Sequence, residues 1–430
     1  MPGSNILLAI LPLFWPKLPP LGLGCLQSYL AQNGLSSDIL DLNNRFYNLA
    51  DESLKKEWLI SCNTALEENI FQRSFSRYPA EFKKLFDYEI IGFSCFKSNF
   101  FSTLQAAELV KSRNKSAKII FGGPEISRQY FKTKGKFSRQ IKQLADFLVA
   151  GEGELALLDY LSGKSKKISA FRQLKDLKGL DSNCYTGLNL NDYPKKDTIA
   201  LQFSRGCIRK CNFCSERLLY QGFRCRQPDN LIEEIKYFQA RGIKYFIFFD
   251  SMLNADLKNL EELCDKIIAN FGSINWEAQM AVRKMPERLL KKIKQSGCYN
   301  LFVGLESGSD ATLKRMNKGF SSKEAEDFFK ALKNAGLFFG ISLIIGYPGE
   351  ARKDFQEGLD FVLRNKALIP KIEQINPFTY YDGTSAQASA DYKINPESLA
   401  RMDIFVQQIK SAGFKYTNAF LGNLIEKNGN

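Results

Sequence analysis

Histidine is missing from all 430 residues of this chain. General acid–base catalysis must therefore fall to Asp, Glu, Lys, Tyr, Cys or a cofactor. No imidazole can bind a metal ion, so every metal site that needs histidine is excluded. This single absence removes several common classes of enzyme.

Long apolar runs are also missing. No stretch reaches the ~18 to 20 apolar residues that a membrane-spanning helix needs. The apolar residues 5–14 have no basic segment before them and lead into the proline-rich stretch 16–20, so they predict a first strand and loop rather than a signal peptide. We therefore expect a cytoplasmic protein.

Paired cysteines of a disulfide framework are absent as well. Seven of the ten cysteines are spread singly along the chain: Cys25, Cys62, Cys95, Cys184, Cys225, Cys264 and Cys298. Such scattering fits a reducing compartment and gives no support to a second metal cluster. We interpret these residues as small buried hydrophobic side chains.

The other three cysteines form one compact motif. Cys207, Cys211 and Cys214 stand in a C-x3-C-x2-C array, directly after an apolar run at 199–203 that predicts a strand. Three thiolates on one loop can bind three irons of a [4Fe–4S] cube and leave the fourth iron open for a substrate or cofactor. A zinc site normally needs four ligands from paired units, and here there is neither a second cysteine pair nor a histidine.

This array resembles the signature of the radical S-adenosylmethionine (SAM) superfamily. The likeness includes Phe213 before the last cysteine and the pair Arg205-Gly206 before the first. It implies that the amino and carboxylate groups of SAM bind the open iron, and that one electron from the cluster releases a 5′-deoxyadenosyl radical. It also implies an electron donor such as flavodoxin or ferredoxin.

The region 198–375 repeats a strand–helix pattern that predicts an open (βα)6 partial barrel, with the chemistry at the carboxyl ends of its strands. We expect helices at 230–241, 257–269, 287–295 and 323–334. Asp229 is the expected N-cap of the first, and Gly242, Gly297 and Gly336 are expected to end helices. The expected strands are 199–203, 245–249, 275–279, 301–304, 338–345 and 372–376.

Polar residues at those strand ends are candidates for contact with SAM. By chemistry alone, a carboxylate suits an ammonium or ribose hydroxyls, and an arginine suits a carboxylate. The alternative is that these side chains cap or bridge elements at the rim. The segments around these strand ends, and residues 346–350, also resemble matching segments of radical SAM enzymes that carry a cobalamin domain. The residues assigned to SAM are Phe213, Asp250, Arg283, Gly304 and Glu306.

Residues 1–162 alternate apolar runs with helical patterns, which predicts a doubly wound, Rossmann-like parallel sheet. An aromatic-rich helical insertion is expected at 45–87. Ligands of such sheets bind at the carboxyl ends of the strands, where glycine allows a close backbone approach. The expected strands are 5–11, 37–42, 89–93, 118–121 and 147–150, and the expected helices are 21–33, 100–113 and one beginning near 152.

The loops after these strands together resemble the cobalamin-binding domain at the front of many radical SAM enzymes. The residues implied to bind cobalamin are Ser94, Gly122, Gly123, Gly151 and Glu152. The loop with a cobalt-binding histidine, Asp-x-His-x-x-Gly, is missing, and residues 11–16 occupy that region. Two interpretations follow: cobalamin is bound without a protein histidine, or the domain is a scaffold without cobalamin.

Three further stretches complete the organisation of the chain. Residues 163–197 lose periodicity and predict a linker, and 376–430 resemble a segment that closes the open side of the barrel. The net charge is +14, and residues 128–142 carry six basic residues without an acid. We expect no nucleic-acid partner, because no recognised RNA-binding module accompanies this charge.

The leading hypothesis is a radical SAM enzyme that methylates an unactivated carbon, with methyl-cobalamin as the methyl donor. The first alternative is a cobalamin-free radical SAM lyase, cyclase or oxidoreductase. The others are a tRNA methylthiotransferase and a non-catalytic metal-binding scaffold. The substrate could equally be a small molecule, a lipid or a peptide.

Overall fold

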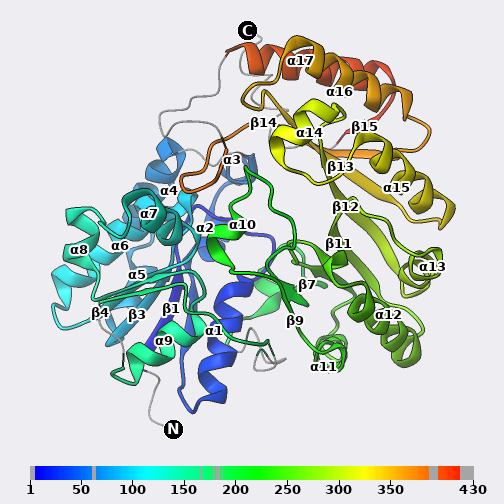
Figure 1. Cartoon of the computed structure of the whole chain (residues 1–430). Coiled ribbons are helices and arrows are strands. Elements are labelled where there is room, and N and C mark those ends of the chain that lie inside the picture. The colour runs from blue at the N-terminus through cyan, green and yellow to red at the C-terminus, as the bar shows by residue number, and fades with distance from the viewer. Residues whose placement is uncertain are drawn as a thin grey trace. The chain divides into compact units, whose positions relative to one another are not determined.

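Figure 1 shows the computed structural model, which divides into two compact units. It describes residues 5–60, 64–164, 167–177, 180, 185, 187–386 and 396–416. The first unit comprises Met1–Ala200, Leu218–Gln221 and Glu233–Ile243, and the second comprises Leu201–Arg217, Gly222–Ile232 and Lys244–Asn430. Within the described residues, no helix is both long enough and apolar enough to span a membrane.

A six-stranded sheet forms the centre of the first unit, in the order β2-β1-β3-β4-β5-β6. All its strand pairs are parallel. The reversal of strand order beside β1 is the mark of a doubly wound sheet. The strands are β1 (Ile6–Ile10), β2 (Asp38–Asp41), β3 (Ile90–Ser94), β4 (Lys118–Gly122), β5 (Phe147–Ala150) and β6 (Ile168–Ala170).

Apolar cores lie on both faces of this sheet. On β1, Leu7 and Ala9 belong to one core and Leu8 and Ile10 to the other, because successive side chains of a strand point to opposite faces. The helices are α1 (Leu21–Gln32), α2 (Leu42–Leu49), α3 (Glu52–Ile60), α4 (Thr64–Arg77), α5 (Pro79–Lys83), α6 (Phe100–Arg113), α7 (Pro124–Thr133), α8 (Arg139–Leu144) and α9 (Glu154–Leu161).

A second sheet has the order β15-β14-β13-β12-β11-β10-β7, and its strands from β10 to β15 belong to the second unit. The pairs from β10 to β15 are all parallel, so the strands follow one another as in an open barrel. The strands are β7 (Thr198–Leu201), β10 (Tyr245–Phe248), β11 (Asn275–Ala281), β12 (Cys298–Glu306), β13 (Phe339–Ile345), β14 (Lys371–Pro377) and β15 (Lys415–Tyr416).

Helices cover the outer face of this sheet, as α12, α13 and α15 do beside β11 to β13 in Figure 1. On β11 the alternate residues Trp276, Ala278 and Met280 are buried, whereas Gln279 on the opposite face is exposed. The helices are α10 (Glu216–Leu219), α11 (Pro228–Gln239), α12 (Leu257–Phe271), α13 (Glu287–Gln295), α14 (Asp310–Met316), α15 (Ser322–Asn334), α16 (Arg352–Arg364) and α17 (Pro396–Ser411).

The predicted fold class is confirmed. Every expected strand is present, and the expected glycine stops at Gly242, Gly297 and Gly336 all have positive φ. At Gly297, a Cβ atom would come within 1.9 Å of the Ile274 carbonyl oxygen, so no other residue fits there. One expectation is wrong: Asp229 is not an N-cap but lies in the first turn, because α11 begins at Pro228.

Strand β6 lies inside the stretch expected to be a linker, where three residues are too few to give a periodic signal. Among the singly placed cysteines, Cys25, Cys95, Cys264 and Cys298 are buried and Cys225 is partly exposed. Cys62, Cys184 and parts of the expected linker and closing segment lie outside the described residues. The basic stretch 128–142 falls on α7, α8 and the turn between them, where Lys134 and Lys136 are exposed.

Candidate active site

The three-cysteine loop lies in the second unit, between the two strands of a small antiparallel ladder, β8 (Ser204–Arg205) and β9 (Arg224–Cys225). Cys207, Cys211 and Cys214 carry free thiols. Burial raises the pKa of all three thiols, and that of Cys214 reaches about 12. An iron that replaces the proton would stabilise the thiolate form that burial disfavours.

This thiol set fits a [4Fe–4S] cluster better than a single ion. Within the described part of the chain, no three Cys, Asp or Glu side chains are grouped so that they could hold one metal ion. In a cube, each thiolate binds a different iron, so the three sulfur atoms need not converge on one point. The donor chemistry, three thiols and no histidine, matches iron–sulfur ligation.

Hydrogen bonds fix the cysteine loop to the segment that follows α14. The Asn212 N–H donates to the Met316 oxygen (2.9 Å), and the Asn212 side chain donates to the Arg315 oxygen (2.8 Å). In the opposite direction, Asn317 donates to the Lys210 oxygen (2.8 Å). The two segments therefore form one rigid edge of the site.

Arg209, in the middle of the loop, adds two charge-assisted bonds. Its Nη1 donates to the Gly319 oxygen (2.7 Å) and its Nη2 to the Val282 oxygen (2.8 Å). These bonds connect the cysteine loop to the ends of two other βα units. Such bonds are stronger than those between neutral groups, so Arg209 is a main anchor of the loop.

Asp250, at the end of β10, is almost fully buried and bonded within the protein. Its carboxylate accepts from the Phe203 N–H (3.3 Å) and from both the N–H and the hydroxyl of Ser204. Burial raises its pKa to about 6, against the opposing effect of these bonds. Asp250 thus holds the chain that enters the cysteine loop, and its predicted contact with SAM stays a prediction.

Glu306 lies at the carboxyl end of β12 with a backbone φ of 71°, a left-handed conformation that is rare outside glycine. The register of β12 against β13 shifts at this point. The Glu306 carboxylate accepts from the Ser342 hydroxyl (3.0 Å) and lies 3.4 Å from the Lys318 ammonium. Strand β12 thus turns the carboxylate toward the segment that holds the cysteine loop.

Gly304 makes this arrangement possible. A Cβ atom at this position would come within 2.8 Å of a Glu306 carboxylate oxygen and within 3.5 Å of Lys318 Nζ. The Phe213 ring lies 5.7 Å from the same Nζ and packs edge-on against Tyr347. Three of the residues assigned to SAM, Phe213, Gly304 and Glu306, therefore gather around Lys318.

Arg283 follows β11, and its guanidinium donates hydrogen bonds to backbone oxygens of the protein. Nη1 donates to the Asn254 oxygen (2.7 Å) and the Ala255 oxygen (2.8 Å). Burial, and then the nearby Arg209, lower its pKa. In this conformation Arg283 supports the loop after β10, and its predicted contact with a SAM carboxylate is untested.

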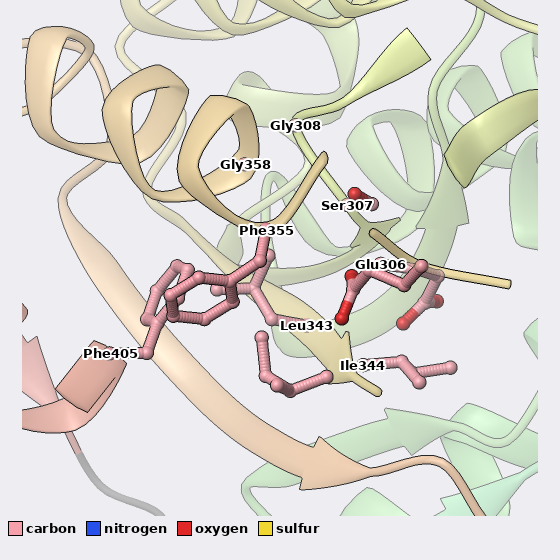
Figure 2. A pocket seen from close by; sticks show the side chains of 10 residues that line it. Glu306, Ser307, Gly308, Leu343, Ile344, Phe355, Gly358 and Phe405 are labelled. Carbon is pink, nitrogen blue, oxygen red and sulfur yellow. The ribbon is translucent and has the colours of Figure 1, made fainter. Parts of the chain in front are cut away.

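A small pocket lies at the carboxyl ends of β12 and β13, where Figure 2 shows Glu306, Leu343 and Phe405 around it. Glu350, from the loop after β13, also lines it. Burial raises the pKa of Glu350 to about 7, and its carboxylate accepts from the Gly346 N–H (2.8 Å). The remaining lining residues are Ser307, Gly308, Ile344, Ile345, Phe355 and Gly358.

In the first unit, the predicted cobalamin residues lie along the carboxyl edge of neighbouring strands. Ser94 and Gly122 are register partners on β3 and β4, and Gly122 faces the Val149 side chain of β5. Gly123 has φ of 98° and no room for a Cβ atom, because the Cys95 oxygen is 2.8 Å away from that position.

Gly151, after β5, has φ of 92°, and its N–H donates to the Ser127 hydroxyl (2.8 Å). Glu152, the next residue, is buried. With no histidine in the chain, this edge fits a corrinoid only if the cobalt has no protein imidazole as a lower ligand. The assignment of Ser94 and the adjoining glycines to cobalamin stays a prediction.

Sequence reasoning missed several residues of this site, Lys318 and Arg209 above all. Lys318 stands in the stretch Met-Asn-Lys-Gly-Phe between two helices, and a lone lysine there has no pattern to separate it from surface lysines. The only available signal was the turn chemistry of Asn317 and Gly319, both of which have positive φ. Ser204, Asn212 and Ser342 were missed for the same reason.

Residues 201–362 match the family model of the radical SAM superfamily, and this segment contains the cysteine loop and Glu306. The matched segment is a radical SAM domain. This family implies a [4Fe–4S] cluster and SAM as cofactors, as the sequence predicted.

Known proteins that this chain resembles differ in their reactions. It is 26% identical over 333 residues to an uncharacterized methyltransferase of Pyrococcus horikoshii, covering 71% of this chain and 70% of that protein. It is also 26% identical over 324 residues to the ribosomal protein uS12 methylthiotransferase RimO of a Nitratiruptor species, covering 71% and 69%.

The fold resembles that of the radical SAM methyltransferase TsrM from Kitasatospora setae, solved with cobalamin and a [4Fe–4S] cluster bound. The TM-score is 0.69 at 14% identity, over 89% of this chain and 77% of TsrM. A likeness that covers so much of the chain confirms the predicted fold class, an α/β chain with parallel sheets.

Proposed function

We propose that this enzyme binds SAM at a [4Fe–4S] cluster held by Cys207, Cys211 and Cys214, and methylates an unactivated carbon with the help of cobalamin. The observation that carries the proposal is the presence, in one chain, of the three-cysteine loop and a doubly wound unit whose Ser94 and Gly122 are register partners. The likeness to TsrM over 89% of the chain supports this combination.

When bound, the cluster supplies the electron that cleaves SAM to a 5′-deoxyadenosyl radical, and cobalamin supplies a carrier for the methyl group. The chain's own residues hold and orient these groups. Arg209 and Asn212 keep the cysteine loop in place, and Asp250 fixes the strand that leads into it. Phe213, Gly304 and Glu306 would border SAM, with Glu306 accepting from its amino group or ribose hydroxyls.

The second candidate is a methylthiotransferase, which the 26% identity to RimO favours. By resemblance, that family carries a second three-cysteine cluster in its first domain. The cysteines in the first 200 residues, Cys25, Cys62, Cys95 and Cys184, are spread singly, and this spacing gives no support to such a cluster. We therefore favour methylation.

Quantitation of metals tests the proposal. The protein would be purified anaerobically from cells supplied with iron and cobalamin. We expect about one cobalt and about four irons per chain. The variant Gly122→Val places a branched side chain at the edge assigned to cobalamin and should lose cobalt. It should keep iron, because a Cβ atom at this position meets only Val149, at 3.6 Å, and the fold should tolerate it. Four irons without cobalt, even after reconstitution with excess cobalamin, would exclude the methyl-cobalamin reaction and leave a cobalamin-free radical enzyme.

A further inference from the structure

A buried ammonium lies beside the cysteine loop. Lys318 is 6% exposed, which is unusual for lysine, whose charge normally stays in water. The carboxylate beside it, that of Glu306, is at the long distance of 3.4 Å, and the Phe213 and Phe320 rings lie 5.7 and 5.5 Å from Nζ. A lysine that served only to pair with Glu306 would be expected to make a shorter contact.

The backbone around Lys318 cannot move away from the cysteine loop without breaking several bonds. Asn317, the residue before it, donates to the Lys210 oxygen, and the Gly319 oxygen, directly after it, accepts from Arg209. The Met316 oxygen accepts from the Asn212 N–H. The position of the charge relative to the three thiols is therefore built into the fold.

Lys318 and Glu306 place opposite charges beside the cysteine loop. The Lys318 Nζ atom lies 5.7 Å from the ring of Phe213, the residue directly before Cys214, and 3.4 Å from the Glu306 carboxylate. The two side chains therefore contribute fields of opposite sign at the place where a cluster would bind.

A [4Fe–4S] cluster with three thiolate ligands becomes more negative when it takes up one electron, and this added charge is costly in a poorly solvated site. We propose that Lys318 is a positioning residue that raises the reduction potential of the cluster, and that the Glu306 carboxylate partly offsets this rise. This inference rests on the proposed cluster at Cys207, Cys211 and Cys214. The electron itself comes from an external one-electron reductant, and no proton is moved.

A redox titration of the cluster, followed by its electron paramagnetic resonance signal, tests the proposal without substrate or SAM. At the midpoint potential of the wild type, Lys318→Gln should lower the ratio of reduced to oxidised cluster on the order of tenfold. Lys318→Arg keeps the charge and should stay close to the wild type. The matched control is Lys314→Gln, which removes an exposed charge four residues away and should have no effect.

Glu306→Gln provides a second, independent measurement, because it should shift the potential in the opposite direction. It also decides the matter if Lys318→Gln does not fold. An unchanged potential in Lys318→Gln together with weaker SAM binding would overturn the inference and assign the ammonium to the SAM carboxylate. An unchanged potential in Glu306→Gln would also overturn it. A wild type that forms no cluster would instead refute the proposed function, and the inference with it.

Discussion

Arg401 of α17 donates from Nη1 to the backbone oxygen of Glu350, at 3.0 Å. The same guanidinium bonds to Glu397 at 2.6 Å and lies over the Phe355 ring. Because Glu350 lines the pocket beside Glu306, Arg401 fixes the last described helix to the loop that borders the candidate site.

Arg401→Ala should destabilise the second unit by about 1 to 3 kcal/mol, because the Glu350 oxygen loses a charged donor and Phe355 loses a packing partner. The free energy of unfolding would be measured in denaturant. Glu397→Ala is the matched control: the Glu397 side chain is 71% exposed, and we expect a loss of less than about 1 kcal/mol. Equal losses in the two variants would show that the bond to the Glu350 backbone contributes little.

Glu350 predicts a pH dependence of stability. Its pKa is about 7 in the folded protein, whereas the ordinary value for a glutamate, expected in the unfolded chain, is 4.5. As the pH rises from 4.5 to 7, the unfolded chain loses this proton first, so the folded state binds more protons and stability falls; above pH 7 the effect is constant. The contribution is on the order of 3 kcal/mol at most.

Glu350→Gln should remove this contribution while keeping an acceptor for the Gly346 N–H. Unfolding at pH 5 and pH 8 would be compared for the variant and the wild type, and the difference between the two pH values should be smaller in Glu350→Gln. Asp250, whose pKa is raised to about 6, changes stability with pH in the same direction. It remains in both proteins, so its effect cancels in the comparison. An unchanged difference would mean that Glu350 ionises normally.

Arg209 should matter more for retention of the cluster than for folding. Arg209→Ala removes the bonds to the Gly319 and Val282 oxygens, and the cysteine loop should then lose iron to a chelator on the order of tenfold faster. Lys210→Ala is the neighbouring control, since its side chain is exposed and its backbone oxygen, which accepts from Asn317, is kept. A similar rate of iron loss in both variants would contradict the anchoring role of Arg209.

The sequence predicted most of the fold because apolar periodicity is a local property. Most strands of both sheets, and helices such as α6 and α13, were predicted in this way, with most boundaries within about two residues. Strands β6 and β15 were not predicted, since they have only three and two residues. Helices α7, α8, α14 and α16 were not predicted either.

The residues of the site were predictable only where they stand close together in the sequence. The cysteine spacing and Phe213 stand in one short stretch, whereas Lys318 and Ser342 become neighbours of Glu306 through the pairing of β12 with β13 and the turn after α14. Such neighbours depend on register and on left-handed turns, which one sequence does not reveal. The interior partners of Asp250 were hidden for the same reason.

Reductive cleavage of SAM is the most direct measure of the central claim. Anaerobically reconstituted protein would be incubated with SAM and dithionite, and 5′-deoxyadenosine would be quantified. The wild type should form it, and Cys207→Ala, Cys211→Ala and Cys214→Ala should each reduce it to background. Cys264→Ala, which removes a buried thiol on α12, should retain it. No 5′-deoxyadenosine from a wild type that contains four irons, or undiminished formation in the three cysteine-loop variants, would contradict the assignment of Cys207, Cys211 and Cys214 as the centre of the enzyme.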